Sequence, residues 1–386
     1  MYAPLRYYIV YLISIVTRFF PLPTKTGIIR IGNPNENSPV LITCNYRLTV
    51  EILKKELKGQ NLYLLVANSN GINVWCAATG GHFTNHDIIS VLKTSGIAEQ
   101  VDHRDYILPQ LSATGIEPRI IKGKTGWNGR WGPTYANQIP NFLSKHTDFT
   151  QNQVKFQTSE RIELACAWAF LMSIFFFIII VWFSLNLAVV TFVLSWIITL
   201  TIFFTFPYYE SFLKNQKKLF YFEKGKLLVE LAFSMIFITL IFVMDTQLSL
   251  LTFEKYILAG LILLMVVIVV TDMKGMTPTF KSDLHEDRLF TIKIHQDQCT
   301  GIGDCELVCP RNCFEFVDEV EYITIPRIDD CVQCGACIVQ CPEDALYFKN
   351  SKGEIIQADI IRKYKLNLLG KRASKACNCT VCKITT

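Results

Sequence analysis

Long uncharged stretches in the middle of the chain place the strongest limit on its fold. Residues 164–183 and 185–206 span 20 and 22 residues without a charged side chain. As helices with a rise of about 1.5 Å per residue, each would be roughly 30 Å long, which matches the hydrocarbon core of a bilayer. Two more stretches repeat this pattern, residues 227–244 with the single charge of Glu230 and residues 256–271, which residues 248–253 could extend. The sequence therefore predicts a transmembrane domain of four helices over residues 161–272.

The composition agrees with a membrane protein and excludes several other classes. Charged residues make up 18% of the 386 residues, hydrophobic residues make up 51%, and the mean hydropathy is +0.29. A typical soluble domain has roughly 25% charged residues, so a soluble enzyme, an intrinsically disordered chain and a low-complexity scaffold do not fit. The formal net charge of +5 is too small to indicate binding to nucleic acid, so we expect no nucleic-acid partner.

Charged residues in the connections predict the orientation in the membrane. The connection between the second and third stretches is rich in lysine, with Lys214, Lys217, Lys218, Lys224 and Lys226 against Glu210 and Glu223. Because connections rich in Lys and Arg stay on the cytoplasmic side, we expect a multi-pass protein of the inner (cytoplasmic) membrane. Four crossings then place both soluble regions in the cytoplasm, where they can meet.

The N-terminal segment, residues 1–20, contains a shorter apolar run. Residues 7–17 are 11 uncharged residues between two arginines, and as a helix they would span only about 16 Å, too short to cross a bilayer. No small-residue cleavage site of a signal peptide follows. We expect a helix that lies on the membrane surface, and a tilted fifth span remains open as an alternative.

Residues 21–160 are expected to form an α/β domain. Short apolar segments predict strands at residues 40–44, 62–67 and 106–108, and the segments between and after them predict helices at residues 49–58, 84–93 and 138–143. Thr84, with Asp87 three residues later, is typical of a helix start. Strands that alternate with helices predict a mostly parallel sheet covered on both faces, a Rossmann-like arrangement.

The C-terminal region carries the most specific motif. Eleven of the fourteen cysteines lie at or after Cys299, which indicates metal chemistry in a reducing compartment. The motif reads Cys331-x2-Cys334-x2-Cys337-x3-Cys341-Pro342. It resembles bacterial two-cluster ferredoxins, an α+β fold, over a domain at residues 291–350 that follows a linker at residues 273–290. Three thiolates at this spacing bind one cubane cluster, and the Cys before Pro reaches the other cluster.

The first half of this domain departs from the ferredoxin pattern. It contains Cys299, Cys305 and Cys309, but Ile302 stands where the second cysteine is expected. The resemblance implies exchanged fourth ligands: one cluster held by Cys309, Cys331, Cys334 and Cys337, and the other by Cys299, Cys305 and Cys341 alone. We therefore expect one [4Fe-4S] cluster, and a [3Fe-4S] or labile [4Fe-4S] cluster at the second position. Cys313 could replace the missing ligand, although its place after Cys309-Pro310 does not suit that role.

The basic tail, residues 351–386, carries three more cysteines, Cys377, Cys379 and Cys382. Nearby lysines favour the thiolate form of a cysteine, and thiolates are ligands for soft metals. Two interpretations remain open. The tail is either an arm that collects a soft metal or metalloid, or a segment with spare thiols.

A second informative segment lies in the α/β region, at residues 71–83. Taken alone, its cysteine would most simply be a buried structural residue. The motif Asn73-Val74-Trp75-Cys76-Ala77-Ala78, however, resembles the cap helix of the mercury-methylation corrinoid protein and is similar to the corrinoid iron–sulfur protein of acetyl-CoA synthesis. The similarity covers about residues 21–145, and the whole domain order looks like the mercury-methylation corrinoid protein fused to its ferredoxin partner.

The resemblance implies a corrinoid (cobalamin) cofactor and a site for it. Cys76 inherits the role of lower axial cobalt ligand, and Asn73 inherits a role in shaping the cap helix. The other residues expected at the cofactor are Val74, Trp75, Ala77, Ala78, Gly80, Gly81, Phe83, Pro109 and Gln110. His82 and His86 could also reach the cofactor, but they fit hydrogen bonding at a helix start better.

Two departures from the family pattern bear on the substrate. The family motif continues Gly-Lys-Gly, whereas this chain has Thr79-Gly80-Gly81, so the lysine is absent. Together with Ile302, this favours a paralogue with a methyl acceptor other than mercury.

Glu230 lies four residues after Lys226, and an ion pair near the membrane surface is the expected arrangement.

The sequence therefore predicts a membrane-anchored corrinoid-dependent methyltransferase. It would pass a methyl group from cobalt to a mercury-like metal or metalloid, or to another acceptor. The fused ferredoxin domain would reduce the corrinoid cobalt. The implied partners are the membrane, a methyl donor protein or methyl-pterin, and an electron donor to the ferredoxin domain. A membrane iron–sulfur electron-transfer protein without a methyl carrier, and a soft-metal sensor that uses the tail, are the alternatives.

Overall fold

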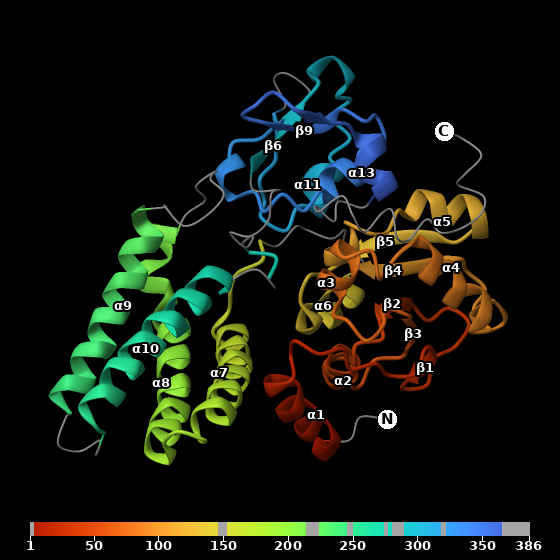
Figure 1. Cartoon of the computed structure of the whole chain (residues 1–386). Coiled ribbons are helices and arrows are strands. Elements are labelled where there is room, and N and C mark those ends of the chain that lie inside the picture. The colour runs from red at the N-terminus through yellow and green to blue at the C-terminus, as the bar shows by residue number, and fades with distance from the viewer. Residues whose placement is uncertain are drawn as a thin grey trace, which may run out of the picture. The chain divides into compact units, whose positions relative to one another are not determined.

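The computed structural model describes residues 4–145, 153–213, 224–244, 250–273, 277–279, 289–317 and 322–364. The chain divides into two compact units. One unit is built mainly from the α/β region and the cysteine-rich C-terminal region, and the other is built mainly from the long apolar helices (Figure 1).

A five-stranded sheet forms the centre of the α/β region, in the order β1-β3-β2-β4-β5. Its strands are β1 (Gly27–Ile31), β2 (Val40–Cys44), β3 (Leu62–Ala67), β4 (Asp105–Pro109) and β5 (Asn128–Gly132). β2 through β5 pair in parallel, and β1 joins the edge of β3 antiparallel. The mostly parallel sheet and the strands at residues 40–44 and 62–67 are confirmed, whereas β1 and β5 were not predicted. β5 is short and contains two glycines, a composition that favours a loop.

Both faces of the sheet are covered, as the sequence predicts. Along β3, Tyr63, Leu65 and Ala67 belong to one apolar core, and Leu62, Leu64 and Val66 belong to the other. Four helices of the domain are α2 (Arg47–Glu56), α4 (Asn85–Thr94), α5 (Pro118–Thr125) and α6 (Ile139–Lys145). α4 and α5 contribute to the first core, and α2 and α6 contribute to the second. The predicted helices are present with ends shifted by a few residues, and α5 was not predicted.

The start of α4 has the predicted cap. Asp87 Oδ2 accepts hydrogen bonds from the Thr84 backbone N–H at 2.9 Å and from the Thr84 hydroxyl at 2.8 Å. These bonds hold the chain where it turns from the preceding loop into the helix. α4 packs against β3, so its orientation helps to position the segment between β3 and α4.

The ferredoxin-like region is a small α+β fold. Its strands are β6 (Phe290–Ile294), β7 (Glu315–Val317), β8 (Tyr322–Thr324), β9 (Leu346–Asn350) and β10 (Ile355–Ile356), and its helices are α11 (Asp304–Val308), α12 (Ala336–Gln340) and α13 (Ala358–Tyr364). β6, β9 and β10 form one antiparallel sheet, and β7 and β8 form a hairpin. β10 and α13 show that the packed structure continues past residue 350, where Ile361 joins the core.

The second unit holds four helices long and apolar enough to cross a membrane, within the described residues. They are α7 (Thr158–Ile180), α8 (Leu185–Tyr209), α9 (Lys224–Val243) and α10 (Thr252–Asp272). Large apolar side chains such as Phe175, Trp182 and Phe204 point outward, which suits a lipid environment. Lys226 Nζ lies 3.8 Å from Glu230 Oε1, so the predicted ion pair forms, and both side chains are buried within the bundle.

The N-terminal run forms α1 (Pro4–Val16), a shorter apolar helix than these four. Tyr7, Val10 and Ser14 are buried, whereas Leu5 and Leu12 are 74% and 64% exposed. A helix with an exposed apolar side suits a membrane surface. The surface location stays a prediction.

Candidate functional site

The Asn-Val-Trp-Cys motif forms a separate short helix, α3 (Val74–Thr79), between β3 and α4. Asn73 is its extended N-cap residue, and its carbonyl accepts the Ala77 N–H at 2.8 Å. Val74, Ala77 and Ala78 are buried and anchor the helix, whereas Trp75 and Cys76 are only half-buried. The helix thus places the Cys76 thiol near the surface of the α/β domain.

The chain turns sharply after α3. The Ala77 carbonyl accepts both the His82 N–H at 2.7 Å and the Phe83 N–H at 3.1 Å, and Phe83 is fully buried. Gly81 adopts a φ of +72°, a conformation that favours glycine, and has open space where a Cβ would lie. His82 does not cap α4, because Thr84 does, and its Nδ1 lies 3.3 Å from Asn70 Nδ2 instead.

A loop from β4, residues 110–117, packs on α3. A Cβ added at Gly115 would lie 2.5 Å from the Phe83 carbonyl oxygen and 2.9 Å from the Ala78 carbonyl oxygen, so only glycine allows this approach. Both α3 and this loop follow the carboxyl ends of parallel strands, β3 and β4. In open α/β sheets, ligands bind outside these strand ends.

The residues around α3 fit a large flat cofactor that the sequence resemblance implies. Cys76 is half-buried beside small side chains that permit close approach. The Thr114 hydroxyl is buried without a hydrogen-bond partner among the described residues, and an orphaned buried group of this kind favours a polar ligand. Gln110, in contrast, is 1% exposed: its Nε2 donates to the Leu307 carbonyl at 3.0 Å, and its Oε1 accepts a hydrogen bond from the Thr134 hydroxyl. Its side chain is therefore engaged within the protein.

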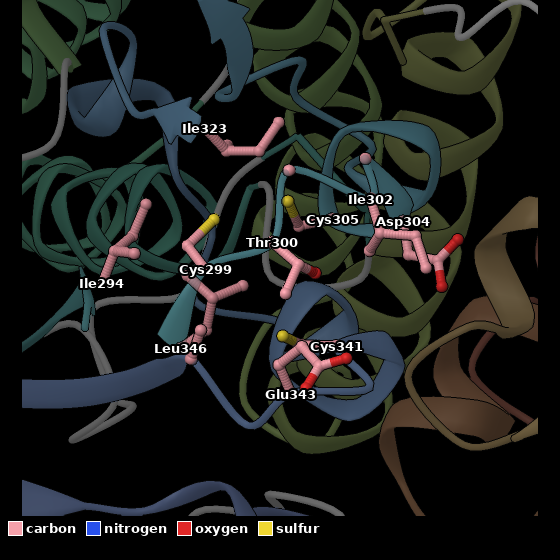
Figure 2. Close-up of a pocket in the computed structure, with 13 residues that line it drawn as sticks. Ile294, Cys299, Thr300, Ile302, Asp304, Cys305, Ile323, Cys341, Glu343 and Leu346 are labelled. Atoms are coloured by element: carbon pink, nitrogen blue, oxygen red, sulfur yellow. The ribbon is translucent and has the colours of Figure 1, made fainter. Parts of the chain in front are cut away.

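The first set of iron–sulfur cysteines lies around one pocket. Cys299, Cys305 and Cys341 line one small pocket together with Ile302 (Figure 2). The three thiols come from the loop before α11, from α11 and from the end of α12. The Ile302 side chain is 62% exposed. The expected three-ligand set is thus brought together, with an apolar, exposed side chain in place of a fourth thiol.

The second set is buried to about the same extent as the first, in which Cys305 and Cys341 are 8% and 9% exposed. Cys309, Cys331 and Cys337 are at most 7% exposed, Cys334 is half-buried, and Cys337 lies near the other three thiols. Cys313 lies with this set: its N–H donates to Cys309 Sγ at 3.3 Å, and its thiol lies beside Cys309 and Cys331. Hydrogen bonding from Cys313 lowers the pKa of Cys309 to about 7, which favours the thiolate that iron needs.

These positions bear on two expectations about cysteines. Cys313 lies on the side of the four-ligand set, away from the pocket of Ile302, which argues against its use as a replacement ligand there. Cys377, Cys379 and Cys382 lie outside the described residues. Among the described residues, no three His, Cys, Asp or Glu side chains are gathered closely enough to hold a single metal ion.

Sequence reasoning missed several residues that contact this region. Gly115, Thr114 and Gln340 carry no motif and are recognised only by their contacts. Gly115 is one of 20 glycines in the chain, and only the close approach of two backbone segments distinguishes it. For Gln340, the one signal that the sequence offers is its position directly before the predicted ligand Cys341.

Comparisons with known proteins match two parts of the chain. Residues 17–143 match the family of the CO dehydrogenase/acetyl-CoA synthase delta subunit, and residues 327–347 match the 4Fe-4S binding domain. The acetyl-CoA decarbonylase/synthase complex subunit gamma of Methanopyrus kandleri is 33% identical over 127 residues, which are 32% of this chain and 27% of the relative. The same subunit of Methanocaldococcus jannaschii is 34% identical over 130 residues, 33% of this chain and 26% of the relative.

These relatives are subunits of an acetyl-CoA decarbonylase/synthase complex, and the chain spans about a quarter of their length. The match supports the corrinoid iron–sulfur side of the resemblance, but it does not single out the mercury-methylation protein. The chain combines a domain of the CO dehydrogenase/acetyl-CoA synthase delta-subunit family with a 4Fe-4S binding domain and four helices long and apolar enough to span a membrane.

Proposed function

We propose that the protein is a membrane-anchored corrinoid-dependent methyltransferase whose ferredoxin domain is its internal electron donor. The observation that carries this proposal is the short helix α3, which presents Cys76 beside the carboxyl ends of β3 and β4 in a domain of a corrinoid-protein family. The four apolar helices supply the anchor.

The residues of the α/β domain would bind and orient the cofactor. Cys76 would hold the cobalt of the cofactor through its thiol, and it is held in place because Val74, Ala77 and Ala78 are buried against the domain. The Thr114 hydroxyl would donate or accept a hydrogen bond at the cofactor's edge, and the open space at Gly81 would admit the ring. When bound, the corrinoid supplies a cobalt centre that can carry a methyl group.

The ferredoxin domain would supply low-potential electrons. Cys309, Cys331, Cys334 and Cys337 would hold a [4Fe-4S] cluster, and Cys299, Cys305 and Cys341 a [3Fe-4S] or labile [4Fe-4S] cluster. Because both domains belong to one chain, the effective concentration of donor and acceptor is high without any further affinity. The lysine-rich connection before α9 favours a cytoplasmic location for both.

The methyl acceptor is proposed more broadly than the resemblance suggests. A metal or metalloid such as mercury fits a thiol-rich tail that includes Cys377, Cys379 and Cys382. The absence of the family's lysine at Gly80 favours a different acceptor. A methyl-pterin or a methyl donor protein would recharge the cofactor.

The test is a visible spectrum and a metal count of the full chain, purified in detergent after expression with ample cobalamin. We expect about one cobalt per chain and a corrin spectrum that changes in Cys76→Ala, with methyl transfer abolished. The half-buried thiol Cys166 on α7 gives the matched control Cys166→Ala, which should leave the spectrum unchanged. Iron without cobalt would instead indicate a membrane electron-transfer protein.

A further inference from the structure

The loop that packs on α3 also contacts the ferredoxin domain. Gln110 Nε2 of the loop donates to the Leu307 carbonyl at 3.0 Å, and Arg119 Nη2, on α5 just after the loop, donates to the Gln340 carbonyl at 3.0 Å. Gln340 Nε2 donates to the Ala113 and Ile116 carbonyls, each at 2.7 Å. Hydrogen bonds thus cross the boundary in both directions: Gln110 and Arg119 donate from the α/β domain, and Gln340 donates from the ferredoxin domain.

Gln340 is the centre of these contacts. Its side chain is 4% exposed, and its amide group reaches two carbonyls of one loop turn. A buried amide nitrogen that donates to two carbonyls in this way restricts the distance and direction between the two segments. Arg362 adds a weaker contact, with its Nε 3.9 Å from Glu117 Oε2.

The apolar part of the boundary involves the second cysteine set. Ala113 of the loop packs with Val308 and Ala336, and the partly buried Trp131 and Cys334 lie against this group. Val308 precedes the ligand Cys309, and Ala336 lies between the ligands Cys334 and Cys337. The four-ligand set therefore borders the α/β domain through Cys334. The three-ligand set approaches the same domain through Gln340, which precedes Cys341, but the Ile302 side of its pocket is exposed.

We propose that residues 110–117 form a fixed electron-transfer junction, in which electrons leave the ferredoxin domain from the four-ligand cluster, across Cys334 and Ala113, toward α3. Gln340 is the positioning residue of this junction. The inference rests on the proposed function and adds to it the order in which electrons pass through the two clusters. Electrons from an external low-potential protein donor reach the three-ligand side first, because that side borders the exposed Ile302.

The step at the junction moves one electron and breaks no bond. A cluster held by the four thiols would lose one electron, a corrinoid held at α3 would gain that electron, and an external low-potential protein donor would restore the cluster. The loop contributes by its position alone. It touches α3 through Gly115 and the cluster-bearing helix α12 through Ala113 and Ile116.

The test disrupts the junction in the full chain and compares it with a matched surface change. Ala113→Arg inserts a long charged side chain at a fully buried position, and Ala98→Arg makes the same change at an exposed position of the same domain. Gln340→Met is a milder variant that keeps the volume and removes both hydrogen bonds. Iron and cobalt per chain, hydrogen exchange of residues 110–117, and the rate of internal cofactor reduction after a pulse of dithionite are measured.

We expect both junction variants to keep their iron, their cobalt and their cluster EPR spectra. Exchange of residues 110–117 should rise about tenfold or more, because two buried hydrogen bonds are lost. Internal reduction should slow by up to about 100-fold, the effect of a small misplacement of reacting groups. Ala98→Arg should match the unmodified protein in every measurement.

The outcomes separate the junction from the proposed function. Normal cobalt content with an unchanged reduction rate in both junction variants would overturn the junction and leave the methyltransferase proposal intact. Unmodified protein that binds no cobalt would overturn the proposed function, and the electron route with it. Unchanged exchange of residues 110–117 would show that Gln340 does not position the loop.

Discussion

The two cysteine segments of the ferredoxin domain, residues 299–310 and 331–342, share a local design but differ in their surroundings. In each, a glycine with positive φ, Gly303 at +82° or Gly335 at +76°, precedes a helix of five residues. At the equivalent place, the first segment has Ile302, 62% exposed, and the second has Cys334, which packs beside Ala113 and Trp131.

This difference indicates that the two halves have separate tasks. A cluster held by the four thiols of the second set would lie beside Ala113 of the α/β domain through Cys334. A cluster held by the three thiols of the first set would lack a protein ligand at one corner, next to the exposed Ile302. In the proposed electron route, the segment with Ile302 in place of a cysteine would receive electrons from the external donor. The segment with the complete cysteine set would pass them to the α/β domain.

The largest effect is expected when the second segment is made like the first. Cys334→Ile should remove about one iron atom per chain by converting the cluster to a three-iron form, and it should abolish internal electron transfer. Iron analysis and EPR spectroscopy measure the change. Retention of a four-iron signal from the second segment would contradict the ligand assignment.

The reverse change should complete the first segment. In Ile302→Cys we expect a gain of about one iron atom per chain and a four-iron signal at the first site, because the new thiol would lie at the border of the existing pocket. Because the Ile302 side chain is exposed, its replacement by cysteine removes no packing from the core. An iron count equal to that of the unmodified protein would show that this corner cannot bind iron.

A third change tests the loop that joins the second segment to α3. Gly115→Ala places a Cβ 2.5 Å from the Phe83 carbonyl oxygen, so we expect a loss of about 1–3 kcal/mol from overpacking. Gly123→Ala, on α5 with open space around it, is the control and should raise stability by about 0.5–1 kcal/mol. Thermal unfolding of both variants decides this, and equal melting temperatures would refute the close approach.

The smallest effect is expected from the charged edge of the junction. Glu117→Gln removes the charge 3.9 Å from Arg362 but keeps an acceptor oxygen, so stability should fall by less than about 1 kcal/mol. Glu315→Gln, which pairs with Arg327 at 3.7 Å on the β7–β8 hairpin, is the control away from the junction. Unfolding at low and high salt should show the larger salt dependence for Glu315, because its pair is exposed whereas Glu117 is 6% exposed, and the opposite order would remove Glu117 from the junction.

Much of the fold could be predicted because it depends on local pattern. The strands at residues 40–44 and 62–67, the capped start of α4 and the four long apolar helices follow from short-range periodicity and from length. β5 could not be predicted in this way, because Asn128-Gly129-Arg130 lacks β propensity and becomes a strand only by pairing with β4.

The residues of the candidate site divide in the same way, into those that a local motif predicts and those that only the folded structure reveals. Cys76 and the iron–sulfur cysteines could be selected from motifs, because ligand spacing is a property of the chain. Gly115 and Thr114 could not, because Gly115 matters through its close approach to Ala78 of α3 and Thr114 through a buried hydroxyl without a hydrogen-bond partner among the described residues, and no motif records either.

The sequence by itself determined four helices long and apolar enough to cross a membrane, the mostly parallel sheet, the likeness to a corrinoid protein and the two unequal cysteine segments. These features depend on hydrophobic length, residue periodicity and spacing within short segments. Only the tertiary structure decided that Cys334 of the complete cysteine set packs beside Ala113 of the α/β domain. That arrangement depends on contacts such as the one between Gln340 and Ala113, 227 positions apart, and such contacts exist only when the chain has folded.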